Sequence, residues 1–440
     1  MGAAAVVIAA NRGPISFRRS DDGGVSASRG GGGGLVSAMA GLAADVGALW
    51  VCAALSDLDR EVAANAPDSR LDQAGYADAG AVQMLPVDAD VFDGAYNAIA
   101  NSTLWFLHHE LTDSLPAYDE PWRQRWDDYV SYNQQFAAAI SAEAAPEARV
   151  LVQDYHLALL PAMLRGQRPD LRIAHFTHTP WATPATFATL PADIARGLLV
   201  GMLGADSIGF HSRRWGQAFI NCCVGVLDTP GSDHEVRYDG HRSAVRVHPL
   251  GVEPAPLLAR AAEPDVAERR AQLAKKLDGR RAIVRVDRTE PSKNIVRGLE
   301  AFRTVIAHHL EYRDRVVHVA LAYPSRQDVA DYRRYTEQVQ AVAAEINDEF
   351  GNDHWTPVLL SVVDDFAQSL ATLSIGDVVL VNPVRDGMNL VAKEAMLLTD
   401  DAVLVLSAAA GAADEMGAGA LLVDPYDVAA TADALHEALQ

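Results

Sequence analysis

The chain has 440 residues, about two to three times the length of a typical single domain, and this length predicts two domains. Hydrophobic residues make up 49% of the chain and charged residues 22%, an ordinary globular composition. The formal net charge of −21 argues against a nucleic-acid partner, because a phosphate backbone requires a basic surface. The apolar runs are short and interrupted, so no membrane span is expected.

The N-terminal segment and the cysteines predict a cytoplasmic protein. The apolar residues 4–9 follow no basic segment and precede no cleavage site, so they predict a first strand and not a signal peptide. Cys52, Cys222 and Cys223 have no metal-binding or CxxC spacing, which is typical of core thiols in a reducing compartment.

Strand-like segments alternate with amphipathic helices along most of the chain, and nearly all of these segments are apolar, as in a parallel sheet covered on both faces. The first expected strands are Ala4–Ala9, Leu49–Ala53, Val82–Val87, Arg149–Val152, Ile173–Phe176 and Ser207–Phe210. A second series comprises Ala244–His248, Ala282–Val286, Val316–Leu321, Pro357–Val362, Val378–Val381, Val403–Leu406 and Ala420–Val423. This alternation predicts a doubly wound α/β fold.

The strand series has a natural break at residues 249–251, which precede the charged helical stretch Glu263–Lys276. We therefore predict two Rossmann-like domains of similar size, residues 1–248 and residues 249–440.

Two features follow the first predicted strand: a polar loop that contains Arg12, and the run Gly30–Gly34. Glycines between a strand and a helix let backbone N–H groups approach an anion. The spacing matches neither the dinucleotide fingerprint nor a P-loop. Taken alone, the run is equally consistent with a flexible loop and with a ligand-binding loop, and Arg12 alone would more often be a surface charge.

In the second half, Arg288 and Lys293 follow the predicted strand Ala282–Val286 and precede a predicted helix. Cations in this position are typical of a diphosphate site, and a solvated basic turn is the alternative.

A second polar segment, beginning with Asp386 and Gly387, follows the strand Val378–Val381. The predicted first-turn amide donors are those of Met388, Asn389 and Leu390. Asp386 at a strand end can bind sugar hydroxyls, and Glu394, one helical turn from those amides, can bind a ribose diol. The alternative is a helix cap by Asp386 and a surface Glu394, which the nearby cations make the weaker interpretation.

In the first half, Asp154 and His178 each follow a predicted strand. A lone histidine is usually structural, although His178 at a strand end before Thr179 and Pro180 is better placed than most. The spacing of His175 and His178 is too weak to predict a zinc site, and no metal is expected. No GxSxG motif or catalytic cysteine signature is present in the sequence.

Together these residues resemble the trehalose-6-phosphate synthase family of retaining GT-B glycosyltransferases, over residues 6–439. The resemblance implies an acceptor-binding domain at 1–248, a nucleotide-sugar-binding domain at 249–440, and an active site in the cleft that they face. The family's G-G-L loop matches residues 33–35, which would bring Gly34 to the donor phosphate and sugar.

The resemblance also implies a role for each candidate residue. Arg288 and Lys293 would bind the diphosphate. Asp386, with the amides of Met388, Asn389 and Leu390, would hold the transferred glucose, and Glu394 the ribose. His178 would bind a donor-sugar hydroxyl, and Asp154 would orient the acceptor hydroxyl.

The family pattern Y-N-x-x-x-N-x-x-L-W matches residues 96–105, and P-S-R-x-D-V matches residues 324–329. By resemblance, the phosphate of glucose 6-phosphate would be surrounded by Arg12, Tyr96, Trp105 and Arg326. The two arginines of this group, Arg12 and Arg326, would form one positive site with Arg288 and Lys293 in an acidic protein.

Two departures from the family pattern stand out. The family's D-Y-x-K-G is here Glu290–Asn294, which keeps Lys293 but alters its loop. Asp364 and Asp365 occupy the place where uridine-using members have an aromatic residue. Because carboxylates can accept hydrogen bonds from guanine, we expect GDP-glucose to be preferred over UDP-glucose.

The expected reaction transfers glucose from a nucleotide-sugar to glucose 6-phosphate with retention, giving α,α-trehalose 6-phosphate, with no cofactor beyond the co-substrate. Alternatives are a glucosylglycerol-phosphate synthase or a pseudo-glycosyltransferase with another acceptor, and a catalytically silent sugar-phosphate sensor. The sequence leaves homo-oligomer formation open.

Overall fold

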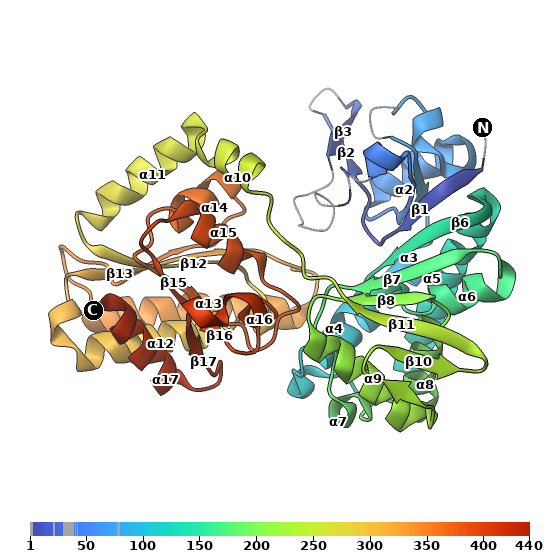
Figure 1. Ribbon diagram of the computed structural model, residues 1–440. Coiled ribbons are helices and arrows are strands. Elements are labelled where there is room, and N and C mark those ends of the chain that lie inside the picture. Colours follow the sequence, from blue (N-terminus) through green and yellow to red (C-terminus); the bar gives the residue numbers. More distant parts are fainter. Residues whose placement is uncertain (1–2, 21–22, 30–38, 40, 42, 77–79) are drawn as a thin grey trace. The chain divides into compact units, whose positions relative to one another are not determined.

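The computed structural model describes residues 3–20, 23–29, 39, 41, 43–76 and 80–440 (Figure 1). It divides into two compact units, Met1–His248 and Pro249–Gln440, and each unit is built around its own sheet. The predicted donor-loop residue Gly34 lies outside the described residues.

The sheet of the first unit is mainly parallel, and its strand order is β5-β4-β1-β6-β7-β8-β11-β10-β9. Its strands are β1 (Ala4–Ala9), β4 (Leu49–Ala53), β5 (Val82–Leu85), β6 (Ala144–Gln153), β7 (Arg172–Thr177), β8 (Ser207–Phe210), β9 (Gly231–Ser232), β10 (Glu235–Tyr238) and β11 (His241–Val247). The last two strands at one edge, β10 and β9, pair in antiparallel fashion.

The helices of the first unit are α2 (Asp57–Asn65), α3 (Ala89–Phe92), α4 (Trp105–His108), α5 (Glu120–Glu143), α6 (Leu160–Gln167), α7 (Pro184–Phe187), α8 (Ala192–Met202) and α9 (Arg213–Leu227). A π-helical segment, Asp93–Leu104, joins α3 to α4, and short 3₁₀ turns lie at Pro67–Ser69, Leu71–Gln73, Thr112–Ser114 and Tyr155–Leu157. Helices α5, α6, α8 and α9 pack in succession against one another.

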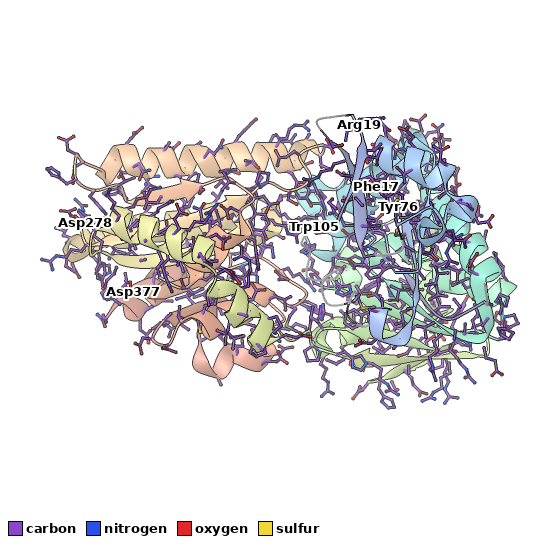
Figure 2. All side chains as sticks on the ribbon, turned by 90° about the horizontal axis from the view of Figure 1, so that it is seen from above. Phe17, Arg19, Tyr76, Trp105, Asp278 and Asp377 are labelled. Carbon is purple, nitrogen blue, oxygen red and sulfur yellow. The ribbon has the colours of Figure 1, made fainter. Side chains whose placement is uncertain are left out.

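A two-stranded hairpin, β2 (Ile15–Arg19) and β3 (Val25–Arg29), covers α2. Phe17 of β2 packs edge-on against Tyr76, with ring centroids 4.8 Å apart, and Figure 2 shows both side chains. The Phe17 amide donates to the buried Asp59 carboxylate of α2 at 2.9 Å. This bond and ring contact fix the hairpin at the end of the first strand.

The second unit has six parallel strands in the order β14-β13-β12-β15-β16-β17. The strands are β12 (Arg281–Arg288), β13 (Val316–Tyr323), β14 (Val358–Ser361), β15 (Val378–Val381), β16 (Val403–Ser407) and β17 (Leu421–Val423). The helices are α10 (Pro254–Ala261), α11 (Pro264–Leu277), α12 (Ile295–His308), α13 (Ala330–Phe350), α14 (Phe366–Leu373), α15 (Leu390–Leu398), α16 (Ala413–Met416) and α17 (Val428–Leu439). Short 3₁₀ turns occupy Pro291–Lys293, Leu310–Tyr312 and Gly417–Gly419.

Helices cover both faces of this sheet, with α11, α14 and α15 on one face and α12, α13 and α17 on the other (Figure 1). The strands are apolar because they lie between these two layers. On α12, Ile295, Leu299 and Phe302 are fully buried at helical spacing. The helical period predicted from the sequence therefore describes the face that packs on the sheet.

Each sheet has a topological switch point, where the chain turns from building one half of the sheet to building the other. In the first unit it lies between β1 and β6, and in the second between β12 and β15. Ligands of doubly wound folds bind at the carboxyl ends of the strands that flank this point.

All thirteen strands predicted from the sequence are present, most with ends shifted by one to a few residues. Residues 244–247 of the segment Ala244–His248, which we expected to open the second series, lie in β11 and pair with β8 in the first unit, and His248 follows the strand. The sequence analysis did not predict β2, β3, β9 and β10. Among the described residues, no helix combines the length and apolarity needed to cross a bilayer.

The buried His318 of β13 makes the stability of the second unit depend on pH. Among the described residues neither ring nitrogen finds a hydrogen-bond partner, and burial lowers the pKa of His318 from 6.5 to about 3. The unfolded state therefore binds a proton below pH 6.5 that the folded state binds only near pH 3, so stability falls as pH falls through this window.

Between pH 7 and pH 5 the unfolded state gains a proton on His318 that the folded state does not bind, which lowers the free energy of unfolding by about 2 kcal/mol. We expect His318→Leu to remove this part of the pH dependence. Hydrogen exchange of β12 and β13 peptides at pH 7, 6 and 5 would measure it in the second unit alone. The exposed His354→Leu is the matched control and should keep the wild-type slope. Identical slopes for both variants would contradict the assignment.

Candidate active site

In the first unit, side chains of α5 and β4 hold the loop that follows β1, which carries Arg12 at the carboxyl edge of the sheet. Tyr132 donates its hydroxyl to the buried Asn11 side chain at 2.7 Å, and the Trp50 indole donates to the Arg12 carbonyl at 3.1 Å. A Cβ on Gly13 would lie 2.5 Å from the Cys52 sulfur, so this turn requires glycine. The Arg12 side chain is exposed.

Asp154 follows β6, directly across the switch point from this loop, and its backbone is strained. Its φ of 69° and ψ of 172° lie in a region that is favourable essentially only for glycine. The conformation is held by a bond from its amide to the Phe176 carbonyl at 2.7 Å and by the His178 amide, which donates to the Asp154 carboxylate at 3.1 Å. Strain of this kind at a strand end is typical of a functional residue.

The structure brings His178 beside Asp154, as the sequence predicts for two residues at neighbouring strand ends. The His178 ring hydrogen-bonds to Gln153 at 3.0 Å, and its pKa is lowered from 6.5 to about 4 by burial. His175 is also buried, with a pKa of about 3, and its Nε2 bonds to the Asp154 carbonyl. Both imidazoles are therefore neutral at physiological pH and can donate or accept hydrogen bonds without carrying charge.

The π-helical segment and α4 position the two aromatic residues predicted for the acceptor. Tyr96 is half-buried and stacks between Phe92 and His156, with centroids 5.0 and 5.6 Å away. Trp105 is only 3% exposed and lies 4.1 Å from the His109 ring. Figure 2 marks Trp105 at the start of α4. Tyr96 thus retains more surface for a ligand than Trp105 does.

In the second unit, Glu290 lies between two of the predicted phosphate-binding cations. Its Oε1 is 2.7 Å from the Arg288 guanidinium and 3.6 Å from that of Arg326, and it accepts a bond from the Ser325 hydroxyl at 2.9 Å. Burial alone would raise the pKa of Glu290, but Arg288, Arg326 and Lys293 hold it at about 2. The Arg288 side chain remains 43% exposed, whereas Glu290 is 1% exposed.

Lys293 and Asp386 meet across the switch point of the second sheet. Lys293 Nζ lies 2.6 Å from the Asp386 carboxylate, which also accepts bonds from the Asn389 side chain at 3.2 Å and from the Met388 amide at 3.3 Å. Burial would lower the pKa of Lys293, but Asp386 and Asp287 raise it, so the ammonium stays charged. The two segments predicted to bind donor phosphate and sugar are therefore in contact.

A buried ion pair supports the Lys293 loop. Arg285, 1% exposed, donates to Asp287 at 2.7 Å, to Asn382 at 3.1 Å and to the Lys293 carbonyl at 2.9 Å. Asn294, where the family pattern has glycine, is left-handed with φ 58°. Asparagine tolerates this conformation, and its amide additionally donates to the carbonyls of Asn382 and Pro425, so the departure preserves the loop geometry.

The N-termini of the two helices that follow the strands at the switch point, α12 and α15, differ. The Ile295 amide of α12 donates to the Tyr335 hydroxyl of α13 at 2.6 Å, so a protein group already occupies that terminus. At α15, Asn389 caps the helix by accepting from the Ala392 amide, and the part of the chain that the structure describes provides no acceptor for the Leu390 amide. Of these two termini, α15 keeps its first amide, that of Leu390, available to an anion among the described residues.

Glu394 lies one turn into α15 and is half-buried. The described residues supply no hydrogen-bond partner to its carboxylate, and burial raises its pKa above the ordinary value. An unpaired, desolvated carboxylate costs free energy in the folded protein, which is typical of a residue kept for a ligand.

The two aspartates predicted to favour guanine behave differently from each other. Asp365 accepts from Arg269 at 2.6 Å with one carboxylate oxygen and caps α14 through the Gln368 amide at 3.0 Å with the other. Asp364 is exposed. The local structure therefore assigns Asp365 to a helix cap and an ion pair within the second unit.

The structure gives several supporting residues that the sequence analysis did not single out: Arg285, Glu290, Tyr332 and Tyr335. Tyr332 and Tyr335 lie one turn apart on α13, and the Tyr332 hydroxyl accepts from Arg326 at 2.6 Å. Their spacing on a predicted helix was visible in the sequence, but their partners are distant along the chain.

One group of described residues could bind a metal ion elsewhere in the second unit. His309, Glu311 and His436 have potential ligand atoms within 4.8 Å of one another. His309 follows the C-terminus of α12, at the sheet edge opposite to Arg288, so this group does not belong to the site described above. The rings of His309 and His436 are stacked, with centroids 3.8 Å apart.

Two Rossmann-like units, each with polar residues at the switch point of a parallel sheet, define a GT-B type glycosyltransferase fold. The model of glycosyltransferase family 20 matches residues 4–440, and the chain belongs to this family, that of the trehalose-6-phosphate synthases.

Relatives with similar sequences are named as trehalose-phosphate synthases. A Botryotinia fuckeliana alpha,alpha-trehalose-phosphate synthase [UDP-forming] is 33% identical over 442 residues, which cover 99% of this chain and 82% of the relative. A probable synthase of the same kind from Arabidopsis thaliana is 32% identical over 443 residues, 99% of this chain but 52% of the relative. The chain thus spans about half of that longer protein.

Two solved structures extend the comparison to bound molecules. A UDP-forming synthase from Burkholderia xenovorans in complex with glucose 6-phosphate is 26% identical, has a TM-score of 0.83, and matches over 99% of this chain and 92% of that chain. An E. coli structure bound with UDP-2-fluoro glucose is 28% identical with a TM-score of 0.85, over 99% and 91% of the two chains.

Proposed function

We propose that the chain transfers glucose from a nucleoside diphosphate glucose to glucose 6-phosphate with retention, and so forms α,α-trehalose 6-phosphate. The observation that carries this proposal is the Lys293–Asp386 ion pair at the switch point of the second sheet, with Arg288 beside it. A cation for the departing diphosphate and a carboxylate for the sugar hydroxyls are the two groups that glucosyl transfer needs there.

The donor side of the proposal rests on the second unit. Arg288 and Lys293 bind the diphosphate, and Asp386 with the amide of Leu390 binds the transferred glucose. Glu394, one turn further along α15, accepts hydrogen bonds from both hydroxyls of the ribose. Its unpaired carboxylate and raised pKa support this role, because ribose hydroxyls would supply the missing hydrogen bonds.

The acceptor side of the proposal assigns residues in each unit separately. In the first unit we assign Arg12 and Tyr96 to the phosphate of glucose 6-phosphate, with the mainly buried Trp105 as a supporting residue, and in the second unit we assign Arg326. Asp154 orients the acceptor hydroxyl and His178 binds a donor-sugar hydroxyl, each at a strand end of the first unit. The strained backbone of Asp154 supports this role, since the strain places its carboxylate at the strand end at a cost to stability.

UDP-glucose is the donor that we now favour. The expectation of a guanine preference depended on Asp364 and Asp365, and Asp365 is already engaged by Arg269 and Gln368. The relatives compared above are named UDP-forming, and one of the solved structures contains UDP-2-fluoro glucose. The comparisons therefore do not support GDP-glucose as the preferred donor.

Release of nucleoside diphosphate, measured with UDP-, GDP- and ADP-glucose, tests this function directly. We expect release to require glucose 6-phosphate and to be fastest with UDP-glucose. We expect NMR of the product to show one glycosidic linkage with the α configuration at both anomeric carbons. Glycerol 3-phosphate is the control acceptor, because it tests the related acceptor class. Faster release with glycerol 3-phosphate, or none with any acceptor, would overturn the proposal in favour of the rival synthase or the silent sensor.

The Glu394→Gln variant tests the ribose contact. Losing hydrogen bonds to a charged group costs about 1.5–3 kcal/mol, so we expect the dissociation constant for UDP to rise at least about tenfold. Because the folded-state pKa of Glu394 is raised, its charge costs stability at neutral pH, and that cost disappears as pH falls. The variant should therefore be at least as stable as the wild type at pH 7.

The exposed Glu437→Gln is the matched control and should alter neither quantity. Calorimetry with UDP and thermal unfolding at pH 7 and pH 5 would measure both effects. Unchanged UDP affinity in Glu394→Gln would remove the ribose role.

The transfer itself follows from the roles of the carboxylates. Asp154 serves the acceptor, Asp386 the sugar hydroxyls and Glu394 the ribose, so none is left as a nucleophile behind the anomeric carbon. The acceptor oxygen then bonds to that carbon on the face where the bond to the diphosphate breaks, and the departing phosphate takes the hydroxyl proton. Arg288 and Lys293 stabilise the negative charge that develops on this phosphate.

This route predicts no glycosyl-enzyme. After incubation with UDP-2-fluoroglucose, a slow donor, the intact protein mass should remain that of the unmodified chain. A mass increase of one fluoroglucosyl unit on Asp154, Asp386 or Glu394 would contradict the front-face route. Lys293→Ala, analysed in parallel, should lower kcat and not only raise KM.

A further inference from the structure

We infer that Glu290 is a positioning residue that holds a donor-binding and an acceptor-binding arginine side by side. The inference rests on the proposed function, in which Arg288 binds the donor diphosphate and Arg326 the acceptor phosphate. Both belong to the second unit, at the ends of the neighbouring strands β12 and β13. One carboxylate would thus prepare the binding of both substrates.

The geometry around Glu290 is that of a shared acceptor. A single oxygen, Oε1, is contacted by Arg288 at 2.7 Å, by Arg326 at 3.6 Å and by the Ser325 hydroxyl at 2.9 Å. Two guanidinium groups on one oxygen would repel each other without the negative charge between them. Their relative position therefore depends on this carboxylate.

Arg326 depends on outside contacts for its own conformation as well. Its φ of 43° lies in the left-handed region, which is unfavourable for a long side chain. Besides Glu290, the Tyr332 hydroxyl accepts from its guanidinium at 2.6 Å, with the ring centroid 5.4 Å from the guanidinium carbon. Tyr332 is fully buried, so its ring is a fixed packing surface for Arg326. Glu290 provides the negative charge that holds the Arg326 guanidinium against this ring.

The burial of Glu290 is the second reason to assign it a role in function. A carboxylate that is 1% exposed carries a large desolvation cost, which this site offsets through the two arginines, Lys293 and the Ser325 hydroxyl. The Arg288 side chain remains 43% exposed, so it can bind a phosphate while it is paired with Glu290. A residue needed only for packing would not require the charge.

Glu290→Gln, which keeps the size and removes the charge, and Glu290→Asp, which keeps the charge and shortens the side chain, separate these effects. Calorimetry of each variant with UDP and with glucose 6-phosphate measures the two substrates separately, and steady-state kinetics gives kcat/KM for each. Glu349→Gln, which removes the charge from another arginine-bound glutamate of the same unit, is the matched control.

We expect Glu290→Gln to lower kcat/KM at least about tenfold for both substrates and to weaken the binding of both ligands, because removing one partner of a buried charged pair is costly. Glu290→Asp should lose less for both, and Glu349→Gln should lose nothing. If Glu290→Gln does not fold, as circular dichroism would show, the paired loss in Glu290→Asp alone decides.

Three results would overturn the inference: tighter binding of both ligands in Glu290→Gln, which would make Glu290 a screening charge; weakening of only one ligand; or unchanged binding of both. These outcomes are distinct from failure of the proposed function. If the proposed function is wrong, the wild type itself would bind no glucose 6-phosphate, or would release no UDP from UDP-glucose when glucose 6-phosphate is present.

Discussion

Pairing of each cation with a carboxylate is the constraint on which the second unit depends. Arg285 pairs with Asp287, Lys293 with Asp386, and Arg288 with Glu290, and these residues lie in the second half of β12 or in the loops that follow β12 and β15. Several positive charges could not otherwise be gathered and partly desolvated in one place without ligand, since an unpaired buried charge is among the most costly features of a fold. The innermost pair fixes the loop through the Lys293 carbonyl, and of the two outer cations Arg288 is 43% exposed whereas Lys293 is 14% exposed. The same arrangement thus stabilises the loop and prepares it for phosphate.

The backbone is strained at strand ends of both units, at or beside residues that we propose to contact substrate. Asp154, Asn294, Arg326 and Asn389 all have positive φ although none is glycine. Such conformations cost of order 1–3 kcal/mol each and persist only where surrounding contacts determine them. Those contacts are visible: the Phe176 carbonyl at Asp154, the Asn382 and Pro425 carbonyls at Asn294, Tyr332 at Arg326, and the Ala392 amide at Asn389. The packing of the buried strands and helices therefore offsets the free-energy cost of the strained loops.

The sequence predicted the buried parallel strands well because each is a continuous apolar run between turn residues, as in β13, where seven of the eight residues are buried. It did not predict β9 and β10 or the hairpin β2–β3, which are short, partly exposed and antiparallel, and which carry no comparable apolar signal. At the site, Lys293 and Asp386 were predictable because strand ends in a parallel sheet share one edge. Glu290 and Tyr335 were not, because their roles depend on partners such as Arg326 and Ile295, which come from other elements, and no spacing rule relates them.

Paired cations also determine how an acidic protein can bind anionic substrates. With a net charge of −21, the chain as a whole repels sugar phosphates at long range, and cations that are already neutralised by carboxylates add little attraction beyond a Debye length. Affinity must then come from short, directional hydrogen bonds on the exposed faces of Arg288 and the other cations, which only a correctly oriented phosphate can complete. A simple anion would meet the same guanidinium groups but would leave the Glu394 carboxylate, proposed for the ribose hydroxyls, without the hydrogen bonds that a sugar supplies. Selectivity for a sugar diphosphate over free phosphate therefore follows from the charge balance that makes the site stable when it is empty.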